Sequence, residues 1–295
     1  MRVELFFDLG LPIVIAWVRI LLKVNENIEQ VIFQLTYEYG QIYLDRCGRI
    51  LREILKDHPE WMLVDPPNPQ KSSLLSSDNG CSFNFGMSSL DLSLRRDAEG
   101  NPITDELLSQ FFTQIEIMSA IVTDRLEITE VTRLGFRIVC CFPVDSKLEA
   151  DEWVRERNAF RIDPQLSALF EGEIKSESLI VEFEGKDRNF RLAIQAGERA
   201  ESKDFGSRKS LVRPRVLSRA QRSHVYSNEK KKYQDEVIRI AKIDRRAEWN
   251  KANVAIVDVD SSQEEPDIEI PPDKFARTSS EMILKIVSEI HKGFA

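Results

Sequence analysis

The sequence predicts an α+β protein in which antiparallel sheets pack against long amphipathic helices. Three observations lead to this prediction. Segments with alternating apolar residues follow one another in pairs, and sequence-adjacent pairs form hairpins, which are antiparallel. Longer segments between them carry apolar residues at steps of three and four, which is the helical period. The 295 residues, 42% of them hydrophobic, suffice for one large domain or two smaller ones.

The first part of the N-terminal half predicts a strand, a helix and a loop. The apolar run at 9–22 contains Pro12 and Arg19 and is shorter than a membrane span, so we expect a buried strand over 13–22. Apolar steps of three and four over 28–55 predict one long amphipathic helix. Prolines and serines over 66–77 then predict a loop.

The rest of this half predicts the order strand, helix, strand. Apolar residues alternate over 83–95, and a change of parity at Ser88-Ser89 indicates a break between two strand pieces. Thr104 is placed to cap a helix that continues to Val122. A strand region is expected over 128–144.

The C-terminal half predicts a similar mixture. Two strands, 173–183 and 189–194, are joined by a glycine-bearing loop and form a hairpin. The remaining expected elements are a charged helix over 226–249, a short strand over 253–259, an acidic loop over 261–272 and a terminal helix over 278–294. We therefore expect two α+β lobes of similar make-up, 1–150 and 151–295.

Several short motifs resemble those of a sporadically distributed prokaryotic family of conserved hypothetical proteins about 250 residues long. The likeness rests on four segments: Pro12-Ile13-Val14, Arg133-Leu134-Gly135-Phe136-Arg137, Val257-Asp258-Val259-Asp260 and Glu289-Ile290-His291-Lys292-Gly293-Phe294. The resemblance covers most of the chain. It implies a cytoplasmic α+β protein and brings no established activity.

The sequence lacks the common catalytic and cofactor-binding motifs. It contains no GxxxxGK[ST], GxGxxG, HExxH or GxSxG pattern, so we expect no cofactor. Its four cysteines show neither a CxxC pair nor zinc-ligand spacing, which favours buried thiols in a reducing cytosol. We therefore expect a cytoplasmic chain that is not bound to a membrane.

Two pairs of charged residues form the candidate polar cluster. Asp258 and Asp260 are two apart on an expected strand, so both carboxylates project from one face. They can hold a divalent metal ion or be solvated at the strand end, and we favour the second. Arg133 and Arg137 also share a face and can clamp an anion or pair with the aspartates. We favour ion pairs, and we expect no metal.

The basic segment, residues 203–248, is the strongest compositional signal. It contains fourteen basic and six acidic residues, a local charge of +8 in a chain of net charge −8, so the remainder carries −16. Such asymmetry is typical of a site for nucleic acid or an acidic partner, but the segment can equally dock on acidic surface of its own chain or a second copy. The expected partner-binding residues are Arg208, Lys209, Arg213, Arg215, Arg219, Arg222, Lys230, Lys231 and Lys232.

Together these features predict a non-catalytic interaction or regulatory protein of the prokaryotic cytosol whose basic segment faces a partner. A protein partner or self-association is expected, with at most weak binding of nucleic acid. The alternative is a metal-dependent enzyme that acts on nucleic acid through Asp258 and Asp260 with arginine support.

Overall fold

The computed structural model describes residues 24–38, 40–64, 70–96, 100–157, 178–185, 187–202, 249–266 and 271–292. The strand expected over 13–22 and the basic segment, with the helix expected from residue 226, lie outside the described residues. The chain divides into two compact units, Met1–Gly197 with Asn253–Ala295, and Glu198–Ala252. The sheet and helices described below belong to the first unit, and the second is described at strand ends alone, 198–202 and 249–252.

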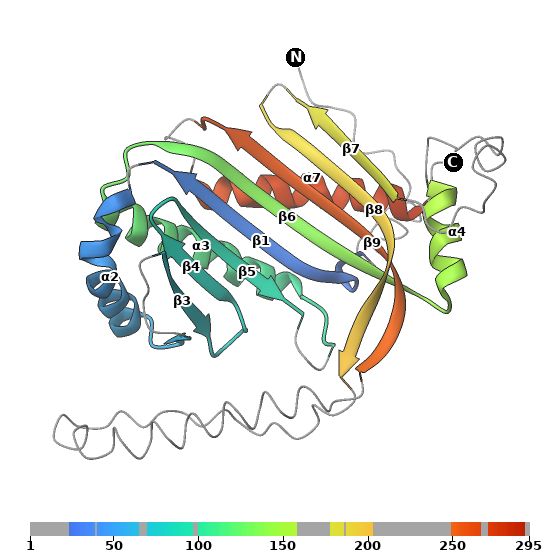
Figure 1. Cartoon of the computed structure of the whole chain (residues 1–295), viewed down its shortest axis with the longest axis horizontal. Coiled ribbons are helices and arrows are strands. Elements are labelled where there is room, and N and C mark those ends of the chain that lie inside the picture. The colour runs from blue at the N-terminus through green and yellow to red at the C-terminus, as the bar shows by residue number, and fades with distance from the viewer. Residues whose placement is uncertain are drawn as a thin grey trace, which may run out of the picture. The chain divides into compact units, whose positions relative to one another are not determined.

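A nine-stranded antiparallel sheet lies at the centre of the first unit and confirms the α+β prediction (Figure 1). Its spatial order is β2-β3-β4-β5-β1-β6-β9-β8-β7. Strands from both expected lobes share this sheet, because β6 pairs with β9 along its length. The strands are β1 (Ile28–Tyr37), β2 (Trp61–Leu63), β3 (Lys71–Ser76), β4 (Ser82–Gly86), β5 (Ser89–Arg95), β6 (Val131–Val144), β7 (Ser178–Glu184), β8 (Asn189–Ser202) and β9 (Trp249–Glu264).

Two long helices, α3 (Asp105–Leu126) and α7 (Pro272–Lys292), cover one face of the sheet (Figure 1). The short 3-10 helix η1 (Gly40–Ile42) leads into α2 (Tyr43–Asp57), which packs against α3, and α4 (Lys147–Arg157) packs beside β6. Thr104 caps α3 as expected, because its Oγ1 accepts a 3.2 Å hydrogen bond from the Leu107 N–H. No helix in the described ranges is long and apolar enough to cross a membrane.

Alternate residues of the central strands build the core between the sheet and these helices. Phe136 of β6 is fully buried, and its ring lies 6.0 Å from that of Phe112 on α3. Ser261 of β9 bonds to Ser279 of α7. The other buried residues of β1 and β6 on this side are Ile28, Val31, Phe33, Leu35, Tyr37, Leu134, Ile138, Cys140 and Phe142.

The helix predicted over 28–55 is wrong in its first part. Residues Ile28–Tyr37 form β1, which pairs with β5 on one side and β6 on the other, and α2 begins at Tyr43. Some apolar residues of this segment are spaced three or four positions apart, and this spacing favours a helix. Phe33 and Tyr37, however, complete an alternation of buried residues that suits a central strand.

The loop predicted over 66–77 is also partly wrong, because Lys71–Ser76 forms β3. Ser72 and Ser76 are buried, and the hydroxyls of Ser72 and Tyr43 lie 2.9 Å apart, so these serines line the core. The acidic loop predicted from residue 261 starts later, since β9 continues to Glu264 opposite Arg133.

The remaining expected elements agree with the structure except at their ends. The segment 83–95 is indeed interrupted, with β4 and β5 on either side of Met87-Ser88. β7 and β8 form the expected hairpin, and α7 begins at Pro272, six residues before the expected start. Proline suits the first turn of a helix, because its missing N–H has no partner there anyway.

Candidate functional site

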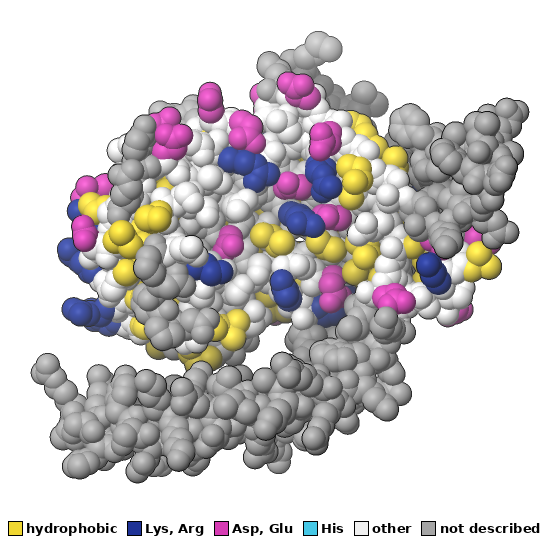
Figure 2. Space-filling model, in the orientation of Figure 1, with side chains coloured by type: hydrophobic (Ala, Val, Ile, Leu, Met, Phe, Trp, Pro, Cys, Tyr) yellow, Lys and Arg dark blue, Asp and Glu magenta, His cyan; other side chains and the backbone are white. Residues whose placement is uncertain are grey.

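The candidate site lies on the face of the sheet that α3 and α7 do not cover, here called the open face. Strand register brings its residues together: Ile32 lies opposite Arg137, and Arg137 lies opposite Asp260. One step further along, Gln34 lies opposite Gly135. Figure 2 shows this face, with basic and acidic side chains interspersed among hydrophobic ones over its middle strands.

Arg137 and Asp258 form a two-pronged ion pair across β6 and β9. The Arg137 Nε lies 2.7 Å from Asp258 Oδ1, and Nη2 bonds to the other carboxylate oxygen. The Asp258 side chain is 13% exposed and that of Arg137 44% exposed. Asp258 raises the pKa of Arg137 by accepting these hydrogen bonds. Both aspartates do project from one face of β9, as the two-residue spacing predicted.

Arg133 reaches three polar side chains from its position on β6. Its guanidinium donates to Gln34 Oε1 at 3.1 Å and to Asp260 Oδ2 at 3.2 Å, and Nε lies 3.2 Å from Glu264 Oε1. The guanidinium lies over Gly135, where an added Cβ would come within 3.0 Å of Nη1. The absence of a side chain at Gly135 thus leaves space for the Arg133 guanidinium. The ion pairs between arginines and aspartates that the sequence favoured are present.

The two aspartates of the cluster differ in their electrostatic surroundings. Burial raises the pKa of Asp260 above its ordinary value, although Arg133 and Arg137 act in the opposite direction. Ionised Asp260 therefore costs the folded state some free energy, and its neighbouring arginines offset part of this cost. The 3.2 Å bond from Arg133 makes Asp260 a structural partner of this arginine.

Two further residues of this face, Gln34 and Asp91, were missed by the sequence analysis. Asp91 of β5 lies opposite Gln34 of β1 and bonds to Asn84 of β4. Its Oδ2 is buried and has no hydrogen-bond partner among the described residues. Burial raises the pKa of Asp91, while the bond from Asn84 and the charge of Lys71 lower it. Recognition of β1 as a strand would have placed Gln34 on the polar face.

We expect Asp91→Asn to change how stability depends on pH. A carboxylate whose pKa is raised in the fold destabilises the ionised protein, so the destabilising contribution of Asp91 should disappear as the pH falls from neutral through the raised pKa. The gain is complete below the unfolded value of about 3.9. The variant should be more stable than wild type at neutral pH and lose this advantage in acid.

Urea unfolding at a series of pH values measures this effect. Glu281→Gln is the control, because Glu281 is an exposed acid on α7, which covers the opposite face of the sheet. An equal pH response of wild type and Asp91→Asn would contradict the assignment of a destabilising charge to Asp91.

The chemistry available to the cluster follows from these bonds. Asp258 and Asp260 direct carboxylate oxygens at arginines, which repel a cation, and this opposes the use of the pair as a metal site. Within the described ranges, no three or more His, Cys, Asp or Glu side chains are grouped so that they could hold a metal ion. The arrangement leaves these four charged groups paired with one another across β6 and β9.

The described histidines and the buried cysteines occupy structural positions. His58 forms the C-cap of α2, and the His291 ring stacks on Phe142 at 4.8 Å. Cys81, Cys140 and Cys141 are buried, and burial raises the pKa of the Cys81 and Cys140 thiols. His224 and the nine basic residues expected to bind a partner lie outside the described residues.

Comparison with known proteins gives no match to a family model, to a curated protein or to a solved structure. The resemblance to the prokaryotic family of hypothetical proteins therefore stays a prediction from the sequence.

Proposed function

We propose that this chain is a non-catalytic interaction protein whose open face binds a protein partner. The proposal rests on one observation: the charged residues of the candidate polar cluster pair with one another. Arg137 holds Asp258 and Arg133 holds Asp260, so these four groups neutralise one another across β6 and β9. Paired, half-buried charges favour recognition over metal-assisted catalysis, which was the alternative.

The mixture of residues on the open face supports a protein partner. Half-buried Ile32, Val139 and Ile256 lie on this face beside the ion pairs. Protein interfaces combine such apolar side chains with arginine and with polar groups at the rim. Partly exposed charge pairs can fix the orientation of a partner and exclude wrongly charged ones. A regulatory role in the prokaryotic cytosol is also proposed, and it rests on the resemblance found in the sequence.

The basic segment is proposed as a second, partner-facing element. Its +8 contrasts with the −16 of the remaining chain, so a partner with acidic surface is attracted to the segment and repelled by the rest. Nucleic acid would meet the same repulsion within a Debye length of about 8 Å at physiological salt. We therefore expect weak, sequence-independent binding of nucleic acid at most.

The proposal is tested with a lysine placed on each side of the sheet. Ile32→Lys puts a charge on the open face, and Met282→Lys, at an exposed methionine of α7, is the matched control. Sedimentation velocity of the purified chain detects self-association, and cross-linking in an extract of the source cells detects another partner. Ile32→Lys should abolish the complex, and Met282→Lys should retain it.

Gel-shift assays with DNA and RNA from low to physiological salt complete the test. Affinity should fall steeply with salt through counterion release. Tight binding that persists at physiological salt, or a complex equally sensitive to both lysine substitutions, would contradict the proposal.

A further inference from the structure

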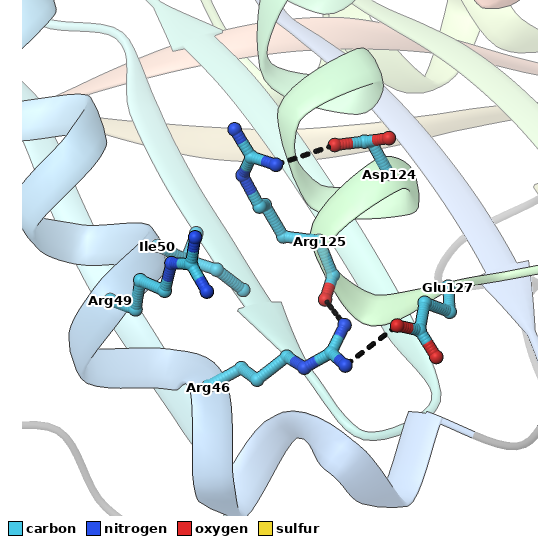
Figure 3. A pocket seen from close by; sticks show the side chains of 6 residues that line it. All are labelled: Arg46, Arg49, Ile50, Asp124, Arg125 and Glu127. Carbon is cyan, nitrogen blue, oxygen red and sulfur yellow. Dashed lines mark hydrogen bonds and ion pairs between the residues drawn. The ribbon is translucent and has the colours of Figure 1, made fainter.

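A cavity of about 340 Å³ lies between α2 and the end of α3, away from the open face. Figure 3 shows Arg46 and Arg49 extending from α2 and Arg125 reaching back from α3. Fully buried Ile50 belongs to the lining, and the exposed acids Asp124 and Glu127 complete it. This site cannot be found from the sequence alone, because its arginines come from segments almost 80 residues apart.

Two of the three arginines are held in position before any ligand arrives. Arg125 is bound by both oxygens of Glu53, each at 2.8 Å, and Glu53 itself does not line the cavity. Arg46 Nη1 donates a 2.7 Å hydrogen bond to the Arg125 carbonyl oxygen. This bond also offsets the negative end of the α3 dipole, which would otherwise repel an anion. Fixed guanidinium groups lose little freedom when they bind a ligand.

Arg49 differs from the other two, because it forms no hydrogen bond or ion pair with another described residue. It is exposed, and it lines the cavity one helical turn from Arg46. An arginine carries five N–H donors and stays charged at any physiological pH. Glu53, one turn further along α2, interacts with Arg49 through space, but Arg49 brings to the cavity a positive charge that no described side chain contacts in a hydrogen bond or ion pair.

The two acids of the lining occupy positions that suit the oxygens of an anionic ligand. Asp124 Oδ2 lies 2.9 Å from Arg125 Nη1, and Glu127 Oε1 lies 2.6 Å from Arg46 Nη2. Their side chains are 71% and 64% exposed. Exposed ion pairs of this kind contribute little to stability, so a more highly charged group can displace both carboxylates.

We propose that this pocket binds the phosphoryl group of a small phosphorylated molecule. Guanidinium groups match phosphate oxygens in hydrogen-bonding geometry, and arginines from two helices can address a tetrahedral group from different directions. The cavity volume is at the lower end for ligand sites, which favours a ligand with few atoms beyond the phosphate. The proposal is independent of the partner proposed for the open face.

Inorganic phosphate is the probe, with binding to the full chain measured by calorimetry at constant ionic strength set with chloride. Arg49→Gln should weaken phosphate binding by about tenfold, which is the loss of one charged contact worth about 1.4 kcal/mol. Arg52→Gln, one turn further along α2 and outside the lining, is the matched control and should bind phosphate as wild type does.

Asp124→Asn tests whether this carboxylate competes with phosphate for the Arg125 guanidinium. It removes a competing carboxylate while preserving the shape of the side chain, so phosphate should bind several-fold more tightly. Malonate, a dicarboxylate, should bind more weakly than phosphate. The proposal is overturned by undetectable phosphate binding, by equal effects of Arg49→Gln and Arg52→Gln, by weaker binding to Asp124→Asn, or by a preference for malonate.

Discussion

Replacing Phe136 by alanine should lower the free energy of unfolding by about 3–5 kcal/mol, the usual cost of truncating a buried phenylalanine. Phe136 is fully buried on β6, which lies between β1 and β9, and its ring packs against Phe112 of α3. The truncated side chain would leave a cavity between the sheet and the helix layer. Urea unfolding with an unchanged m-value would show that stability, and not the denatured state, has changed.

Phe183→Ala is the matched control for this prediction. Phe183 is 53% exposed on β7, the strand at one edge of the sheet, so its truncation should cost less than about 1 kcal/mol. If the two alanine variants lost equal stability, the assignment of the core to the helix-covered face of β6 would be wrong.

Asp258→Ala should lower the free energy of unfolding by about 1–2 kcal/mol, because Arg137 loses the partner of two charge-assisted hydrogen bonds. The cost stays below that of breaking a fully buried pair, since the Arg137 side chain is 44% exposed and can be hydrated. A double-mutant cycle with Arg137→Ala should give a coupling energy of about 1 kcal/mol.

Glu182→Ala provides a reference for this cycle. Glu182 lies 3.9 Å from Arg191 in an exposed pair, and its removal should change stability by less than about 0.5 kcal/mol. A fully stable Asp258→Ala variant that has lost a metal-dependent nuclease activity of the wild type would instead support the alternative function.

Local patterns were sufficient to predict much of the fold. Thr104 as an N-cap, the interruption near Ser88 and the β7–β8 hairpin depend on neighbouring residues, and all three are present. The segment 28–55 was harder because its apolar residues fit the helical period and strand alternation at once. Its partners β5 and β6 decide between the two, and they are distant in sequence.

The polar cluster was only partly predicted, because some of its members meet through contacts between segments distant in sequence. Asp258 and Asp260 are an even number of residues apart, and so are Arg133 and Arg137. The two-residue period of a strand is therefore enough to place each pair on one face. Gln34 and Asp91 join them through the order of strands in the sheet, which no local pattern contains. The arginine pocket depends on how α2 packs against α3, and such packing is equally invisible in a single sequence.

The position of β6 between β1 and β9 has a consequence for how the chain is made. β9 begins about 105 residues after β6 ends, so at about 5–20 residues per second the wait lasts about 5–20 seconds. During this time one edge of β6, rich in β-branched and aromatic residues, has no strand beside it. Charges on an unpaired edge hinder pairing with other chains. Arg133 and Arg137 should therefore protect the nascent protein from aggregation before the aspartates that later neutralise them have left the ribosome.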